Sequence, residues 1–393
     1  MKTVYADNNA TTRVDPEVLE EMLPYFSELY GNPSSMHTFG GQVGGALDEA
    51  RERVAKLIGA DPKEILFTSC GTESDSTAIL GTLHSYPEKH HIVTTRVEHP
   101  AVLTLCEHLR KEGYSLTELP VDHEGRIDLD QLRDAITPYT AVVSVMYGNN
   151  ETGVLFPVEE IARIVKEKGS VFHSDAVQAV GKIPINMAQN EIDFLALSGH
   201  KLHAPKGVGA LYIRKGTRFR PFLIGGHQEF GRRGGTENVP NIIGLGKACE
   251  LAGRYLEDEN TRVQAMRDRL EAGLLERVPG ALLNGEKKHR LPNTTSISFE
   301  YIEGEGILLL MSREGIAASS GSACTSGSLE PSHVLRAMGV PFTAAHGSVR
   351  FSLSRFNTEE DIDHILEKLP PIIQQLRELS PFWKRRHKTA ASQ

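Results

Sequence analysis

The chain has 393 residues, of which 39% are hydrophobic and 24% are charged, a composition typical of a soluble globular protein with room for one large domain and a smaller one. Its 43 Lys and Arg residues are outnumbered by 51 Asp and Glu residues, giving a formal net charge of −8. No basic block interleaved with aromatic residues is present to follow a phosphate backbone, so nucleic acid is excluded as an expected partner.

The N-terminus indicates where the protein is located, and the cysteines indicate whether it binds a metal. Charged residues at Lys2 and Asp7 precede any apolar run, and no later run is long enough to span a membrane. We therefore expect a cytoplasmic protein that does not bind a membrane. The four cysteines are scattered with no close pair, which fits neither a disulfide framework nor a stable metal site. They are Cys70, Cys106, Cys249 and Cys324.

Short β-rich runs alternate with helical patterns between about residues 60 and 245. The runs occupy residues 65–69, 91–95, 141–146, 171–175, 194–198 and 209–213. Between two of them, residues 158–168 carry apolar side chains at helical spacing, as expected of an amphipathic crossover helix. This alternation predicts an α/β domain with a mainly parallel sheet covered by helices.

The pattern changes after GRRGGTENVP (231–240). A long helical pattern, interrupted near residues 257–260, leads into shorter elements, and the last helix is predicted to begin at Asn357 and Thr358. These elements predict a smaller α+β domain. We place the large domain at residues 16–255 and the small domain at residues 1–15 and 256–393.

Polar residues follow several of the predicted strands. Lys201 lies just after residues 194–198, and Asp175 ends the run at 171–175. Thr72 lies at a predicted helix start, and His99 and Asn150 follow two further strands. Each of these residues alone is more often a helix cap or a solvated loop residue than a catalytic group. In open α/β sheets, however, ligands bind at the carboxyl ends of the strands, where all of these residues are expected.

Together these residues fit one cofactor, pyridoxal phosphate. It needs a lysine amine that can form a Schiff base, a buried acid beside its pyridine nitrogen, and a helix N-terminus with hydroxyl groups for its phosphate. Lys201 follows Asp175 by 26 residues, which leaves room for one crossover and the next strand. Both side chains can therefore reach the same crevice.

Motifs along nearly the whole chain resemble those of the group I cysteine desulfurases, which belong to the fold-type-I, class-V aminotransferase family. The motifs are DNNATTRVDPE, FTSCGTESDSTAIL, VEHPAV, NNETG, HSDAVQAVGK, SGHKLHAPKGVGALY, GRRGGTEN, SSGSACTSGSLEPSH and HGSVRFSLSR. They are most similar to the nitrogen-fixation (NifS) branch. The resemblance implies a seven-stranded, mainly parallel sheet flanked by helices, with a smaller α+β domain.

The resemblance also implies roles for the matching residues. Lys201 is the implied Schiff-base lysine, Asp175 the partner of the pyridine nitrogen, and Gln178 a partner of the ring oxygen. His99 is implied to stack on the ring and to shuttle protons. The implied phosphate and cofactor contacts are Gly71, Thr72, Asn150, Ser198, Gly199, His200 and, reaching across a homodimer to the other subunit, Thr236. Asn150 and Arg350 are implied to bind the substrate carboxylate.

Cys324 lies among small residues in SSGSACTSGS (319–328). Cys106 and Cys249 lie in apolar periodic segments, where a buried thiol is expected to be inert. The glycine and serine neighbours of Cys324 instead predict an exposed, mobile loop. The resemblance implies that Cys324 accepts sulfur from L-cysteine as a persulfide, leaving alanine. It also implies that the loop delivers sulfur to an acceptor or iron–sulfur scaffold protein, with Cys324 as a transient cluster ligand, for nitrogenase maturation.

Other functions remain open at this point. Another fold-type-I enzyme, such as an aminotransferase or a selenocysteine lyase, would share Lys201 and Asp175 but depend less on Cys324. A non-catalytic iron–sulfur assembly scaffold with a vestigial cofactor site is an alternative of another class. Cys70 is a second candidate thiol, since a helix N-terminus lowers the pKa of a cysteine, although a packing role is favoured for it.

Overall fold

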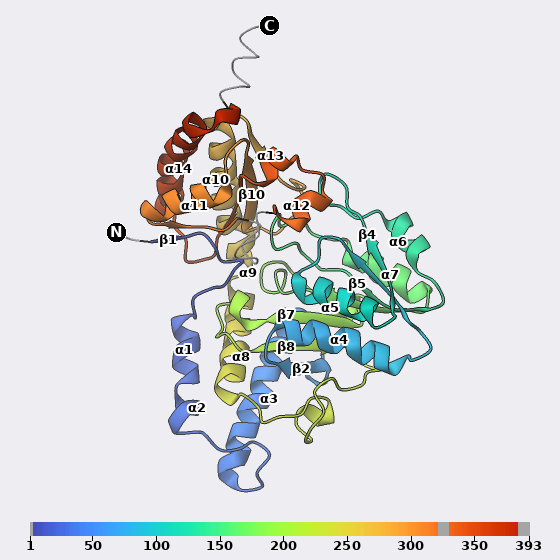
Figure 1. Cartoon of the computed structure of the whole chain (residues 1–393). Coiled ribbons are helices and arrows are strands. Elements are labelled where there is room, and N and C mark those ends of the chain that lie inside the picture. The colour runs from blue at the N-terminus through green and yellow to red at the C-terminus, as the bar shows by residue number, and fades with distance from the viewer. Residues whose placement is uncertain (1–2, 321–329, 384–393) are drawn as a thin grey trace.

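The computed structural model describes residues 3–320 and 330–383. Its largest element is a seven-stranded sheet in the order β2-β8-β7-β6-β5-β3-β4 (Figure 1). The strands are β2 (Ile65–Thr68), β3 (His91–Thr95), β4 (Ser115–Leu119), β5 (Thr140–Ser144), β6 (Val171–Asp175), β7 (Phe194–Ser198) and β8 (Gly209–Ile213). All neighbouring pairs are parallel except those of β8, which runs antiparallel to β2 and β7. The predicted mainly parallel sheet is confirmed, and edge strand β4 is one that the sequence pattern missed.

Helices cover both faces of this sheet. On one face, α4 (Gly71–Ser85) and α5 (Pro100–Lys111) share a core with Ile92 and Val142. On the other, α3 (Thr38–Ile58), α6 (Leu129–Ala135), α7 (Val158–Glu167) and α8 (Val239–Arg254) share a core with Val93 and Val143. Successive strand residues point to opposite faces, so Ile92 and Val93 anchor different layers. This explains why the central strands are buried at every residue rather than alternating between buried and exposed.

A second, smaller core lies above the sheet in Figure 1. It surrounds the antiparallel strands β12 (Ser348–Ser352), β10 (Thr294–Phe299) and β9 (Ala281–Leu283), and the parallel pair β1 (Val4–Tyr5) and β11 (Ile316–Ala317). Helices α10 (Gln264–Arg277), α11 (Gly304–Arg313) and α14 (Glu359–Leu379) pack around these strands. The first strand of the chain therefore packs with the C-terminal part, while the domain boundaries proposed from the sequence stay a prediction.

Two short helices connect the two cores. The C-terminal part includes α12 (His333–Ala337) and α13 (Phe342–Ala345), yet Val334, Leu335 and Met338 pack into the core of the large sheet. The chain therefore crosses back to the large sheet after residue 330. This crossing brings α12 to the edge of the sheet where the strands end.

The predicted interruption near residues 257–260 is a helical turn of a different kind. After α8, the chain forms α9 (Leu256–Asp258) and then a π-helical turn, η5 (Glu259–Val263), before α10. The side chain of Asn260 donates to the backbone oxygens of Leu256 and Lys182, each at 2.8 Å. The polar residues that suggested a break therefore tie this turn to the large sheet.

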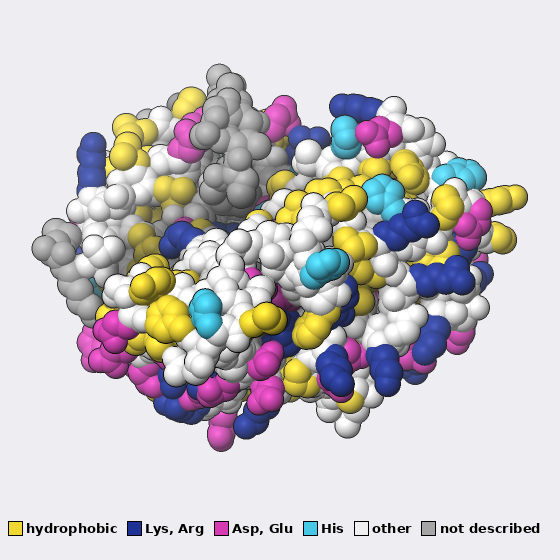
Figure 2. Space-filling view, turned by 90° about the horizontal axis from the view of Figure 1, so that it is seen from below, with side chains coloured by type: hydrophobic (Ala, Val, Ile, Leu, Met, Phe, Trp, Pro, Cys, Tyr) yellow, Lys and Arg dark blue, Asp and Glu magenta, His cyan; other side chains and the backbone are white. Residues whose placement is uncertain are grey.

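The remaining elements are short. They are α1 (Pro16–Met22), α2 (Pro24–Ser27), η1 (Pro62–Glu64), η2 (Met187–Gln189), η3 (Gly199–Lys201) and η4 (Glu229–Gly231). In the ranges 3–320 and 330–383, no helix combines the length and the apolar character needed to cross a membrane. Figure 2 shows basic and acidic side chains interspersed over one face of the molecule.

Candidate active site

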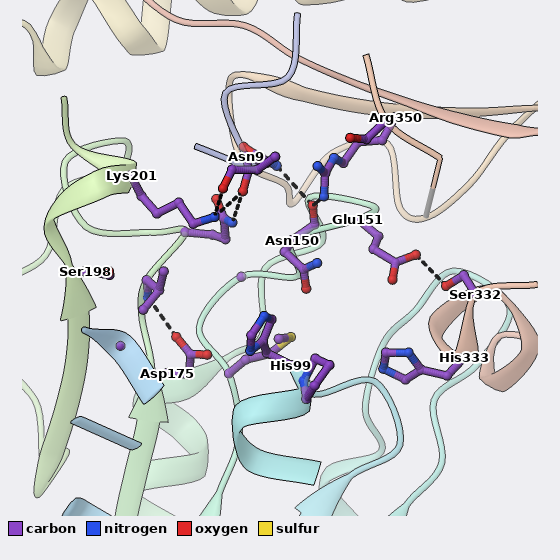
Figure 3. A pocket seen from close by; sticks show the side chains of 18 of the residues that line it. Asn9, His99, Asn150, Glu151, Asp175, Ser198, Lys201, Ser332, His333 and Arg350 are labelled. Atoms are coloured by element: carbon purple, nitrogen blue, oxygen red, sulfur yellow. Dashed lines mark hydrogen bonds between the residues drawn. The ribbon is translucent and has the colours of Figure 1, made fainter. Parts of the chain in front are cut away.

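A cavity of about 570 Å³ lies at the carboxyl ends of the large sheet. Strands β2, β3, β5, β6 and β7 all run in the same direction, so the segments that follow them meet at one edge. Ten of the residues singled out from the sequence line the cavity (Figure 3). They are Gly71, Thr72, His99, Asn150, Asp175, Gln178, Ser198, His200, Lys201 and Arg350, of which Figure 3 labels His99, Asn150, Asp175, Ser198, Lys201 and Arg350.

Lys201 enters this cavity from η3, directly after β7. Its Nζ donates hydrogen bonds to the backbone oxygens of Asn9, at 2.5 Å, and Ala10, at 2.7 Å. Burial, followed by the nearby charges of Lys182 and Arg350, lowers the pKa of Lys201 to about 7, while Asp175 and Asp7 act in the opposite direction. A large fraction of this amine is therefore uncharged near neutral pH, the form that can act as a nucleophile or base.

Gly199 supports this placement from beneath. It does not line the cavity, and a Cβ atom there would lie 2.9 Å from Cγ1 of Val208 and 3.1 Å from Cβ of Ala204. The glycine lets the short turn of η3 pack tightly against the following strand. The structure therefore gives Gly199 a packing position, while Ser198 and His200 on either side face the cavity.

Asp175 ends β6 and faces the same cavity as Lys201 (Figure 3). Its Oδ1 accepts a hydrogen bond from the backbone N–H of Val177 at 2.9 Å. Burial raises the pKa of Asp175, whereas His99, the Val177 hydrogen bond and Lys201 lower it. A buried carboxyl group of this kind favours a cationic N–H partner in the cavity.

Behind Asp175 lies a group of buried residues that the sequence analysis missed. Asp75 Oδ1 is 3.3 Å from Nε2 of His173, and Nδ1 of His173 is 2.9 Å from Oγ of Ser144. Burial raises the pKa of Asp75 well above its usual value, and the charges of Asp175 and Glu98 add to this shift. Burial also lowers the pKa of His173 to about 3, so this ring is neutral. The signal for Asp75 was available, since it lies three residues after Thr72 on the same helix.

Two histidines face the cavity with different nitrogen atoms engaged (Figure 3). Nδ1 of His99 accepts from the backbone N–H of Ala101 at 3.1 Å, so a neutral His99 carries its proton on Nε2. Nε2 of His333 lies 2.9 Å from the backbone oxygen of Glu98 and must donate to it, which leaves Nδ1 as the acceptor. Burial lowers the pKa of both rings. The cavity therefore holds one ring poised to donate and one poised to accept.

The start of α4 forms a cradle for an anion. Gly71 and Thr72 begin this 15-residue helix and line the cavity, and free N–H groups of a helix N-terminus favour negative charge. A Cβ atom on Gly71 would lie 2.9 Å from Cγ2 of Val177, so only glycine fits there. Ser198 and His200 also face this part of the cavity. The cradle suits a phosphate group.

Arg350 comes from β12 and faces the sheet edge from the other side (Figure 3). Its Nη2 lies 2.9 Å from Oδ1 of Asp7, and its Nη1 donates to the backbone oxygen of Asn150 at 3.0 Å. The Nε group is buried and has no hydrogen-bond partner among the described residues. Arg350 is thus held in place with a donor still available for a carboxylate.

A second contact joins the two sides of the cavity. Oγ of Ser332, the residue before α12, donates to Oε2 of Glu151 at 2.5 Å. Burial raises the pKa of Glu151 to about 7. Ser319, Ser320 and Glu330 also line the cavity. The segment between the last two of these, including Cys324, lies outside the described residues.

Other residues from the sequence analysis lie elsewhere. Thr236 is exposed and does not line the cavity of its own chain, so its expected contact with a partner subunit stays a prediction. Burial raises the pKa of both Cys106 and Cys249 to about 12, which makes these thiols unreactive. Cys70 lines the cavity as the residue before α4. Over residues 3–320 and 330–383, no group of three or more His, Cys, Asp or Glu residues is arranged to hold a metal ion.

Residues 4–365 match the aminotransferase class-V family. The chain is 63% identical over 384 residues to the cysteine desulfurase NifS of Azotobacter vinelandii, covering 98% of this chain and 96% of the relative. A solved NifS-like protein is 42% identical with a TM-score of 0.89, over 95% of this chain and all of that one. SspA, solved in complex with cysteine, is 35% identical with a TM-score of 0.80, over 90% of this chain and 99% of that one. The chain therefore belongs to the aminotransferase class-V family, within which it groups with the NifS-type cysteine desulfurases.

Proposed function

We propose that this protein is a cysteine desulfurase, a sulfurtransferase that converts L-cysteine to L-alanine and leaves the sulfur on Cys324 as a persulfide. One observation carries the proposal. A single cavity brings together an amine, Lys201, a buried acid, Asp175, and a carboxylate-binding cation, Arg350. Ser320 and Glu330, the described residues on either side of the segment that contains Cys324, line the same cavity.

We infer that the cofactor is pyridoxal 5′-phosphate, because the lining residues fit its parts. Asp175 supplies a buried carboxylate for the ring nitrogen, and the start of α4 supplies a cradle for the phosphate. Lys201 supplies the amine that would hold the cofactor covalently. When bound, this cofactor supplies an aromatic ring that accepts electrons and stabilises negative charge on the substrate carbon. His99 and Gln178 also line the cavity, which supports their proposed contacts with the cofactor ring and its oxygen.

Arg350 and Asn150 orient the substrate. The guanidinium is already held by Asp7 and by the backbone oxygen of Asn150, so little conformational entropy is lost when a carboxylate binds. SspA is a solved relative in complex with cysteine, which supports a site for this amino acid.

The sulfur transfer is balanced without an external oxidant. The thiolate of Cys324 attacks the substrate sulfur and forms an S–S bond while the bond from Cβ to sulfur breaks, and its electron pair remains on the substrate carbon. A proton returned to that carbon gives alanine. Lys201 and His99 are the groups proposed to move protons, which is supported by their position in the cavity lining and by pKa values lowered by burial.

The protein is proposed to act as a homodimer in which Thr236 reaches the phosphate of the other subunit. Thr236 is exposed, and large exposed hydrophobic side chains occur both near it and in the N-terminal region, which supports a covered surface. They include Phe26, Tyr30, Met36, Ile224 and Phe230. The acceptor is proposed to be an iron–sulfur scaffold or sulfur-acceptor protein that docks at the Cys324 segment, with Cys324 as a transient cluster ligand. The similarity to NifS of Azotobacter vinelandii supports a role in nitrogenase maturation.

The decisive experiment mixes the purified protein with L-cysteine and follows alanine in solution and peptide masses together. We expect alanine to form and one sulfur atom to be added to the peptide that contains Cys324. Cys324→Ala should abolish both in the absence of reductant. Cys70→Ala is the matched control, since Cys70 also lines the cavity, and it should retain both.

Other outcomes would identify the alternatives. Alanine formation by Cys324→Ala at the undiminished rate would contradict the persulfide mechanism and favour a selenocysteine lyase. Consumption of cysteine with formation of a keto acid would indicate an aminotransferase. A chain that binds no pyridoxal phosphate and forms no alanine would indicate a non-catalytic scaffold.

A further inference from the structure

A second lysine is buried behind the cavity. Lys182 follows β6 by seven residues and has only 6% of its surface exposed. Its Nζ donates to the backbone oxygen of Gln178 at 3.1 Å and lies 3.3 Å from Oε1 of the same residue. An ammonium group is rarely buried without a functional or structural partner.

A short chain of hydrogen bonds connects Lys182 to Lys201. Nε2 of Gln178 donates to the backbone oxygen of Asn9 at 3.0 Å, and the same oxygen accepts from Nζ of Lys201 at 2.5 Å. Both lysines also line a second, small cavity of about 20 Å³. This space is large enough for a single water molecule.

Glu259 faces the same small cavity from the π-helical turn η5. Its side chain is buried, and its Oε2 has no hydrogen-bond partner among the described residues. Asn260, the next residue, donates to the backbone oxygen of Lys182 at 2.8 Å and so fixes this turn beside the lysine. Single π-helical turns occur frequently at functional sites. Burial lowers the pKa of Lys182 to about 8 and raises the pKa of Glu259 to about 7, and the charge of each residue favours the charged form of the other.

We propose that Lys182 and Glu259 are positioning residues that favour the uncharged form of the Lys201 amine, with Lys182 as a neighbouring positive charge behind it and Glu259 as the group that favours the protonated form of Lys182. A neighbouring cation is a known means of activating a lysine. The proposal rests on the proposed role of Lys201 as the reactive amine.

Other charged groups also surround the two lysines and must be weighed against this pair. Those around Lys201 are Asp7, Asp175, His99, His200, Lys182 and Arg350, and those around Lys182 are Glu259, Lys201, His203, Arg350 and Arg355. Burial is the largest cause of the lowered pKa of Lys201, and Lys182 is the largest charge effect, ahead of Arg350. Asp175 and Asp7 act in the opposite direction. Lys182 is thus the charge whose removal is expected to change Lys201 most.

The test measures the protonation of Lys201 directly, in the full-length chain prepared without cofactor. Brief reductive methylation with formaldehyde across a pH series, followed by peptide mass spectrometry, gives the pH at which Lys201 is half reactive. Lys182→Met should raise this pH by about one unit, at the low end of shifts caused by neighbouring charges. At a pH below both midpoints, this means about a tenfold lower rate. Lys182→Arg should restore the original midpoint.

Glu259→Gln tests whether Glu259 acts through Lys182. If it does, this variant raises the midpoint of Lys201 by less than Lys182→Met, and it gives no further rise in the Lys182→Met background. A direct effect of the Glu259 charge on Lys201 would instead lower the midpoint. Glu259→Gln retains Lys182 and carries the test if Lys182→Met does not fold. Lys166→Met, which removes an exposed lysine paired with Glu191, is the control and should change nothing.

The outcomes separate this inference from the proposed function. An unchanged or lower midpoint in Lys182→Met, or failure of Lys182→Arg to restore it, would overturn the role of Lys182. That result leaves alanine formation by the wild-type protein unaffected. Conversely, a wild-type protein that forms no alanine but shows the expected midpoints would reject the desulfurase and retain the Lys182–Glu259 pair.

Discussion

The two sides of the cavity are built in different ways. On the sheet side, Asp175 and Lys201 end or directly follow buried strands, so strand direction brings their backbones to the site. On the opposite side, Arg350 is positioned by Asp7 and Asn150, which are 343 and 200 residues away in the chain. The sheet side is therefore set by strand direction, and the opposite side by contacts between distant segments.

This difference predicts where substitutions act. A change on the sheet side should remove a chemical group while leaving its neighbours in place, because the strands are held by their own hydrogen bonds and core. A change on the opposite side should alter the fit between the two parts and weaken substrate binding first. The following predictions test this distinction, from the largest expected effect to the smallest.

Lys201→Ala should have the largest effect. The variant loses the amine that faces Asp175 and the phosphate cradle, so alanine formation should fall by more than about a thousandfold. The absorbance of bound cofactor should be lost as well. Lys166→Ala, at an exposed lysine, is the control and should match the wild type. A variant at position 201 with more than a tenth of the wild-type rate would contradict the assignment.

Arg350→Lys tests the opposite side. Lysine keeps the positive charge beside Asp7 but loses the planar donor pair, so kcat/KM should fall about 10- to 100-fold, mainly through KM. Steady-state alanine formation measures this. Arg290→Lys is the matched control, because Arg290 is buried in an ion pair with Glu271 and does not line the cavity. Arg290→Lys should lower the melting temperature without raising KM. A rise in KM as large as that caused by Arg350→Lys would contradict the proposed difference between the two sides of the cavity.

Two buried carboxyl groups, one on each side of the cavity, are expected to make the stability of the protein depend on pH in different ways. Burial raises the pKa of Glu98, behind the sheet edge, to about 8, and that of Glu151, on the opposite side, to about 7. A carboxyl group whose pKa is raised in the folded state contributes fully to the free energy of unfolding below its unfolded-state pKa of about 4.3. This contribution is lost as the pH rises through the folded-state pKa. The loss is at most about 1.4 kcal/mol per pH unit for each group.

Glu151→Gln should therefore remove the part of the decline in the free energy of unfolding that ends near pH 7. Glu98→Gln should remove the part of the decline that continues to about pH 8. Urea unfolding from pH 5 to 9 measures both. Identical pH profiles for the two variants would show that the two sides are not electrostatically distinct. The matched control is Glu367→Gln, at a fully exposed carboxylate beside Lys368, which should leave the profile unchanged.

Asp75→Asn should have the smallest effect. Burial and the neighbouring acids Asp175 and Glu98 raise the pKa of Asp75 well above its usual value and so favour its neutral form. An amide of the same shape should therefore change the free energy of unfolding at pH 7 by less than about 1 kcal/mol. Urea denaturation measures this. A large loss of stability would show that Asp75 is ionised and paired with His173.

Most of the large sheet could be predicted from the sequence. Six of its seven strands appear as short buried runs, and α7 begins at Val158 as the apolar spacing predicted. Edge strand β4 was missed because its burial is partial and its sequence, SLTEL, lacks a continuous apolar run. The turn at Glu259 was read as a break because a π-helical turn has no recognisable local pattern.

Some residues of the site were predicted from the sequence and others were not, because only local patterns can be recognised in a sequence. Residues directly after strands were found, whereas Asn9, Glu151 and His333 were not, although DNNATT, NNETG and EPSH were noted as motifs. Their roles depend on partners more than 90 residues away, such as the hydrogen bond from Asn293 to Asn9. Cys324 was singled out from its unusual neighbours, and its role stays a prediction because it lies outside the described residues.

The sequence by itself determined the order of strands and helices, the mainly parallel sheet, and the set of polar residues at the strand ends, because these follow from local periodicity and chain direction. Only the tertiary structure decided which distant side chains complete the cavity, which acids and amines lose their usual pKa values, and that Lys182 lies behind Lys201. Burial and long-range contacts set these properties, and neither is encoded in the spacing of residues along the chain.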